Sequence, residues 1–117
     1  MIEDLRAALS APDNLELVMD NIAHLQPYDI AQVLLELDRN EQQQFMDVLP
    51  LDLATEVLEY LEPEAQYGLL HHCDEERAKA LLRTLPSDTA VDLLLAIHPR
   101  QAEVLLTWLP EEYRERI

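Results

Sequence analysis

A twelve-residue repeat constrains the fold of this chain more than any other feature of its sequence. Every twelfth residue from Leu25 onward is apolar. These residues, called landing positions below, are Leu25, Leu37, Leu49, Leu61, Cys73, Leu85, Ile97 and Leu109. The residues eight and nine places after each landing are also apolar, as Val57 and Leu58 are after Leu49. A fixed period with no insertion or deletion is typical of stacked structural repeats.

One unit of the repeat, from Leu49 to Leu61, has the pattern of an amphipathic helix. Its apolar residues Ala54, Val57, Leu58 and Leu61 have the i, i+3, i+4, i+7 spacing that places them on one helical face. Each unit then has about nine helical residues and two or three turn residues, a length that is marginal alone and needs neighbouring helices. The sequence therefore predicts an all-α fold of short antiparallel helices wound as an α-solenoid with a twelve-residue period.

Prolines and acidic residues mark the helix starts. Six prolines follow a landing position by one or two places: Pro27, Pro50, Pro63, Pro86, Pro99 and Pro110. Proline fits the first helical turn and pushes the preceding residue out of helical conformation. Units without proline have other starters, Asp38 or Asn40 in one and Asp74 in another.

The length of 117 residues fits a single domain, 1–117. Within it, 1–24 form two lead-in helices, marked by Ile2, Leu5 and Leu9 and then by Leu15, Val18, Met19 and Ile22. Residues 25–117 form the repeat array, and its end in the middle of a unit predicts that the chain is part of a longer protein.

Composition excludes several classes of function. A formal charge of -16 repels nucleic acid and anionic lipid headgroups and favours cations or basic protein surfaces. The single glycine, Gly68, excludes a Gly-rich nucleotide-binding loop, and the single cysteine, Cys73, excludes an internal disulfide. The sequence also has no signal-peptide layout and no apolar stretch of about 20 residues. These features predict that the chain lies in the cytosol and outside the membrane, where it could still be the soluble part of a membrane protein. No Ser, Cys or carboxylate recurs with the histidines in a triad-like pattern, which predicts no catalytic activity.

Three segments of the repeat carry a resemblance to a known family. HLQPYDIAQVLLELD (His24 to Asp38), LPLDLATEVLEYLEPEAQ (Leu49 to Gln66) and LPSDTAVDLLLAI (Leu85 to Ile97) resemble the cytosolic N-terminal domain of the MgtE family of magnesium channels and transporters. The similarity covers essentially the whole chain. A related helical repeat also occurs in a flagellar motor switch protein.

The resemblance implies a right-handed superhelix that acts as a magnesium sensor. In the family this domain precedes a pair of CBS domains, a connecting helix and a transmembrane pore, and the full-length protein is a homodimer in the cell membrane. High cytosolic magnesium closes the pore because Mg²⁺ bridges acidic residues where the N domain faces the CBS domains. The implied cofactor is therefore weakly bound Mg²⁺, shared with another domain, and the implied partners are the CBS domains and the connecting helix.

Four carboxylates are the candidate metal ligands. Asp88 and Asp92 are four residues apart on one predicted helix, with no basic residue from Pro86 to Pro99, so a cation or a basic partner would relieve their repulsion. A solvated helix face is the alternative explanation for this spacing. The resemblance matches Asp88, Asp92 and Glu56 to acidic positions of the family's magnesium-dependent contact, and Glu59 follows one turn after Glu56.

A run of metal-ligating residue types, His71 to Asp74, resembles a zinc cluster only in composition. Adjacent helical residues point about 100° apart, and Cys73 occupies a landing position, which predicts that its sulfur faces the core. No second pair at ligand spacing completes such a site.

Five other residues have structural interpretations. His24 and His98 are predicted as caps or surface residues, and Gly68 as a site where two helices approach closely. Trp108 and Tyr60 share the position eleven past a landing, where they complete the core or form a patch that faces a partner. The competing function for the whole chain is a protein-interaction solenoid, either a stand-alone relative or a motor-switch-like scaffold.

Overall fold

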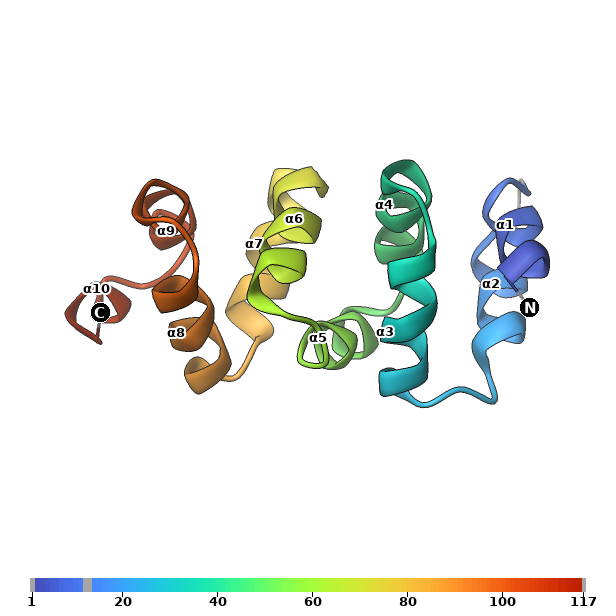
Figure 1. The fold of residues 1–117 in the computed structure, drawn as a ribbon, viewed down its shortest axis with the longest axis horizontal. Helices are drawn as coiled ribbons and strands as arrows, with labels where there is room; N and C mark the ends of the chain where they lie inside the picture. The colour runs from blue at the N-terminus through green and yellow to red at the C-terminus, as the bar shows by residue number, and fades with distance from the viewer. Residues whose placement is uncertain (1, 12–13, 117) are drawn as a thin grey trace. The chain divides into compact units, whose positions relative to one another are not determined.

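The computed structural model describes residues 2–11 and 14–116, and all of its regular secondary structure in these ranges is helical. The chain divides into two compact units, Met1–Tyr60 and Leu61–Ile117. The helices of the first unit are α1 (Ile2–Leu9), α2 (Asn14–Ile22), α3 (Pro27–Glu36), α4 (Arg39–Val48) and α5 (Leu51–Leu58). Those of the second are α6 (Pro63–His72), α7 (Glu75–Thr84), α8 (Ser87–Ala96), α9 (Pro99–Leu106) and α10 (Glu112–Arg116). Figure 1 labels the helices of each unit.

Helix starts follow the sequence repeat. From α3 to α9 each helix begins twelve residues after the previous one, and each is 8 to 10 residues long. Pro27, Pro63 and Pro99 are first helical residues, whereas Pro50 and Pro86 are the N-caps of α5 and α8. The predicted role of proline at helix starts is therefore confirmed for these five prolines, whereas Pro110 lies two residues before α10.

The first unit is built around α4, which packs against α1, α2 and α3, while α5 packs against α3. Asp38 caps α4: its Oδ1 accepts the Glu41 N–H at 2.9 Å, and Glu41 Oε1 accepts the Asp38 N–H at 3.0 Å. Glu41 also pairs with Arg6 Nε of α1 at 2.8 Å. One capping box therefore both starts α4 and ties it to the lead-in helix.

The second unit has α6 packed against α7 and α8, and α8 packed against α9. Its α7 begins after Asp74, which is the N-cap residue but accepts no capping hydrogen bond through its side chain. His98 caps α9, because its Nδ1 accepts the Arg100 N–H at 3.1 Å. The prediction that His98 is a cap is confirmed.

The core consists of the positions that the repeat predicts. The residues eight and nine past the landings from Leu25 to Ile97 are all buried: Val33, Leu34, Phe45, Met46, Val57, Leu58, Leu69, Leu70, Leu81, Leu82, Leu93, Leu94, Leu105 and Leu106. The position five past a landing is buried alanine in four units: Ala54, Ala78, Ala90 and Ala102. Small side chains at that position let helix backbones pack closely. In α2 the apolar stripe begins at Val18, because Leu15 is exposed.

Two sequence predictions change in the structure. A Cβ added to Gly68 would meet no atom within 4 Å, so the predicted close helix approach at this glycine is wrong. Cys73 is half-buried at the C-cap of α6, whereas Leu49 and Leu85, the equivalent C-cap residues of α4 and α7, are buried, so Cys73 is not fully inside the core as predicted.

Candidate functional site

Helix α8 displays the first pair of candidate ligands. Its buried face is Ala90, Leu93 and Leu94, which packs against α6 and α9, so Asp88 and Asp92 fall on its exposed side. The side chain of Asp88 is 93% exposed. A carboxylate pair four residues apart on an exposed helical face can offer oxygen atoms to one hydrated cation.

A basic residue lies beside this pair. Arg116 Nη2 of α10 is 3.4 Å from Asp88 Oδ1, and Arg114 Nη1 of the same helix is 3.3 Å from Glu103 Oε2 of α9. The lack of a basic residue from Pro86 to Pro99 therefore does not leave Asp88 uncompensated, because folding of the unit brings in an arginine 28 residues away. Exposed ion pairs of this kind contribute little and exchange readily with solvent and salt.

The second candidate pair belongs to α5. Glu56 lies in the last turn of this helix, and Glu59 is its C-cap residue rather than a helical one. Both side chains are exposed, and neither makes an ion pair or side-chain hydrogen bond with a residue that the structure describes. This pair lies in the first unit, whereas Asp88 and Asp92 lie in the second.

No group of three or more His, Cys, Asp or Glu side chains comes together as a metal site within residues 2–11 and 14–116. In the predicted cluster-like run, His71 stacks on Tyr67 with ring centroids 5.6 Å apart and is exposed. The His72 ring lies edge-on to His71 at 5.0 Å. In the described structure, the contacts of the His71 ring are therefore with the rings of Tyr67 and His72.

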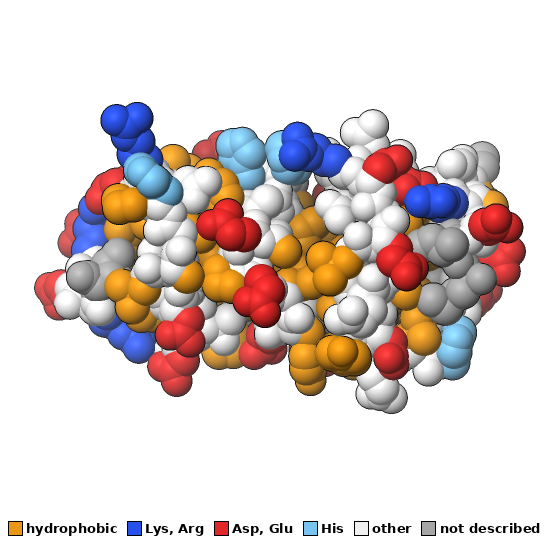
Figure 2. All heavy atoms as spheres, viewed as in Figure 1, with side chains coloured by type: hydrophobic (Ala, Val, Ile, Leu, Met, Phe, Trp, Pro, Cys, Tyr) orange, Lys and Arg blue, Asp and Glu red, His pale blue; other side chains and the backbone are white. Residues whose placement is uncertain are grey.

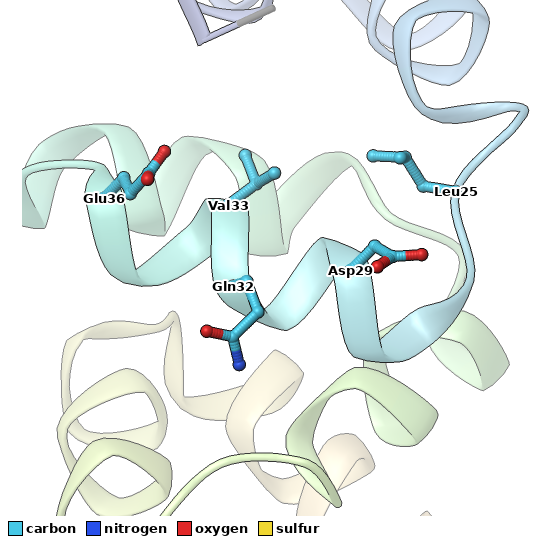
Figure 3. Close-up of a pocket in the computed structure, with 5 residues that line it drawn as sticks. All are labelled: Leu25, Asp29, Gln32, Val33 and Glu36. Atoms are coloured by element: carbon cyan, nitrogen blue, oxygen red, sulfur yellow. The ribbon is translucent and has the colours of Figure 1, made fainter.

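A shallow hollow of about 290 Å³ lies beside α3 in the first unit (Figure 3). Asp29 and Glu36 lie on α3 at its edge, with Val33 between them and Leu25 on the preceding loop. Asp29 already accepts the Gln26 N–H at 3.2 Å as part of the start of α3. One of the two carboxylates of the hollow is therefore already hydrogen-bonded at the start of α3, and apolar side chains lie beside it. The hollow thus differs from the exposed acidic pair of α8.

Sequence reasoning missed two contacts near the candidate residues. Besides Arg116, Tyr28 of α3 lies edge-on to Tyr60 after α5, with ring centroids 5.8 Å apart. No local pattern predicts either contact, since each joins helices that are neighbours only in the folded unit. Tyr60 itself is more than half exposed, while Trp108 is half-buried and its carbonyl accepts the Arg83 Nε–H at 2.8 Å.

These features define a class: an acidic, all-helical repeat protein whose exposed helix faces carry carboxylates. The family model of the MgtE intracellular N domain matches residues 25–117. The chain belongs to this family, whose domain is a non-catalytic helical part of a transporter. Comparisons with curated proteins and with solved structures gave no match. Within the described ranges, none of the helices combines the length and apolar character needed to cross a membrane.

Proposed function

We propose that this chain is the magnesium-sensing regulatory domain of an MgtE-like transporter, and that it acts through acidic contacts with CBS domains that Mg²⁺ completes. The observation that carries the proposal is the family match over residues 25–117, together with the exposed Asp88 and Asp92 on one face of α8. The matched range includes all four candidate ligands, Asp88, Asp92, Glu56 and Glu59.

Shared sites suit the chemistry of these side chains. Mg²⁺ is a hard cation that keeps several waters and is usually held by one or two carboxylates. Asp88 and Asp92 can supply that number from one helix, and a facing domain would supply the remainder. In the absence of the cation, carboxylates on both sides of such a contact repel each other, so the contact forms when magnesium rises.

The proposal extends to architecture and location. The family match supports a single N-type domain wound as a right-handed superhelix, as the resemblance implies, and the twelve-residue spacing of helix starts within each unit supports its period. The domain would lie on the cytoplasmic side of the cell membrane, contact the CBS domains and connecting helix of the same transporter, and dimerise through the full-length protein. These features stay predictions.

The isolated chain allows a first test. Melting temperatures are compared in MgCl₂ and in NaCl at equal ionic strength, because monovalent salt only screens charge whereas a bound divalent ion stabilises the folded state by mass action. A higher melting temperature in MgCl₂ is expected. Equal melting temperatures would show that this chain holds no site of its own and would leave only sites shared with another domain.

The decisive test uses the intact transporter with Asp88→Asn and Asp92→Asn together. The double substitution removes two ligands of the bridging Mg²⁺, which weakens closure of the pore by magnesium, but it also removes repulsion between the facing domains, which favours closure. We expect the loss of ligands to dominate, because a bridging cation adds attraction whereas neutralisation only removes repulsion. A coupling of about 1 to 3 kcal/mol corresponds to a roughly 5- to 150-fold shift in the magnesium midpoint. Patch-clamp recording should find channels that stay open at magnesium concentrations that close the parent.

An unchanged midpoint in that variant would move the sensing role away from α8. Glu56→Gln with Glu59→Gln is then the next variant, since this pair is also exposed. Glu75→Gln with Glu76→Gln is the control, because it neutralises two exposed carboxylates of α7, both beside Lys79, that the resemblance does not match to the family's magnesium-dependent contact.

A protein-interaction solenoid is the second candidate function. The observation that favours it is the exposed Tyr28 and Tyr60 pair, since exposed aromatic side chains in contact are typical of binding surfaces. The two functions differ in one simple observation, which is whether the source gene continues past Ile117 into CBS domains and apolar helices.

A further inference from the structure

Two tyrosines form an exposed aromatic pair in the first unit. Tyr28, in the first turn of α3, and Tyr60, just after α5, are 54% and 55% exposed. Their ring centroids are 5.8 Å apart with an interplanar angle of 84°, an edge-to-face contact. Figure 2 shows hydrophobic side chains at the surface over α5. The chain has few aromatic residues, so the exposure of two tyrosines in contact is a specific feature rather than a background one.

Carboxylates line the same side of α5. Asp52, Glu56 and Glu59 have i, i+4 and i+7 spacing, and Tyr60 follows at i+8, so all four share one side of the helix and its end. The three carboxylates are exposed, and none of them makes an ion pair or side-chain hydrogen bond with a residue that the structure describes. The two tyrosine rings therefore share this side of α5 with three carboxylates that no basic side chain in the described part of the unit neutralises.

The contact between the rings does not by itself explain their exposure. An edge-to-face pair stabilises the packing of α3 on α5, but more than half of each side chain still faces solvent. Nucleic acid and anionic lipid are excluded as ligands, because the unit has thirteen acidic and two basic residues. An aliphatic partner would cover the rings but would also strip water from the carboxylates without replacing it.

Arginine satisfies both features at once. Its planar guanidinium stacks on the face of an aromatic ring and donates several hydrogen bonds to carboxylates in a fixed geometry. Lysine offers a point charge that a carboxylate attracts but that stacks less well on a ring. The combination of open ring faces and exposed carboxylates thus favours arginine over lysine, and cations over neutral groups.

We propose that Tyr28, Tyr60 and the Asp52, Glu56 and Glu59 carboxylates form a docking surface for an arginine-bearing segment of a partner protein. This contact needs no metal ion, so it is separate from the magnesium-dependent contact proposed above even though Glu56 and Glu59 belong to both. A partner held here stays attached at low magnesium, when carboxylates facing other carboxylates repel.

The test uses the whole chain and three capped, helix-forming peptides in EDTA. The peptides carry three arginines spaced four residues apart, the same number of lysines, or the same number of citrullines, which are neutral counterparts of arginine. The arginine peptide should shift the ring resonances of Tyr28 and Tyr60 in NMR spectra and bind about three-fold more tightly than the lysine peptide. The citrulline peptide should cause no shift.

Substitutions separate the rings from the charge. Tyr28→Leu with Tyr60→Leu should abolish the preference for arginine over lysine, while Tyr28→Phe with Tyr60→Phe should keep it. Glu56→Gln with Glu59→Gln should weaken both charged peptides. Tyr113→Leu is the matched control, because this half-buried tyrosine lies in the second unit beside Arg116, with the guanidinium 5.8 Å from its ring centroid, and should change nothing at the docking surface.

Two results would overturn the proposal. One is equal binding of the arginine and lysine peptides to the parent, which would show that charge alone attracts them. The other is an arginine preference that survives in the double leucine variant, with melting curves confirming that this variant is folded. Because EDTA is present throughout, failure of the magnesium proposal changes neither result.

Discussion

The first unit carries thirteen acidic and two basic residues, whereas the second carries eleven and six, so their formal charges are -11 and -5. In the first, Arg6 is committed to Glu41, which ties α1 to α4. In the second, Lys79, Arg114 and Arg116 all face carboxylates, at 3.3 to 3.8 Å. The two units thus combine one repeat with different surfaces.

Their cores differ as well. At the positions eight and nine past the landings from Leu25 to Ile97, the first unit has valine, leucine, phenylalanine and methionine, whereas the second has only leucine. The repeat therefore fixes which positions are buried and leaves the shape of the side chain to local packing. The surface is under no such constraint, so it is the part in which function can vary between units.

Core truncation should have the largest effect and should be similar in both units. Leu58→Ala in α5 and Leu82→Ala in α7 remove fully buried side chains nine past a landing, at a cost of about 2 to 5 kcal/mol each. Thermal melts of the two variants measure this, with the exposed Glu59→Ala as control. Melting within a degree or two of the parent would mean that the register of the repeat is wrong.

Loss of a helix cap should cost more stability in the first unit than in the second. Asp38→Ala removes the bond from the Glu41 N–H to Asp38 Oδ1 and should cost about 1 kcal/mol. Asp74→Ala at the equivalent start of α7 removes no capping hydrogen bond and should cost only about 0.3 kcal/mol, from the helix dipole. Urea unfolding of both variants checks the difference, and equal losses would contradict it.

The register of the helices and the buried positions could be predicted from the sequence, because an apolar period reports which face of each helix turns inward. Contacts between helices at the surface could not. Arg116 beside Asp88 and Tyr28 beside Tyr60 depend on how helices pack, at separations of 28 and 32 residues that no local pattern encodes. The prediction for Gly68 failed for the same reason, since a helical pattern does not show what lies opposite a missing side chain.

Gly68 offers a stabilising change that is specific to the second unit. Glycine within a helix costs about 0.5 to 1 kcal/mol relative to alanine, and a Cβ here meets no atom within 4 Å. Gly68→Ala should therefore raise the free energy of unfolding by about that amount. Denaturant titration checks it, and a loss of stability would indicate a contact at this position that the described structure does not contain.

The smallest expected effect concerns the ion pair that makes Asp88 different from the carboxylates of α5. If Arg116 and Mg²⁺ compete for the Asp88 carboxylate, Arg116→Gln should lower the magnesium concentration at the midpoint of the Asp88 amide shift in an NMR titration. Because the pair is exposed, the midpoint should fall by no more than about five-fold. Arg114→Gln is the matched control, since it removes the same charge from α10 but leaves Asp88 its partner. Equal midpoints in the two variants would show that net charge, and not the contact with Arg116, sets the response of this helix to the cation.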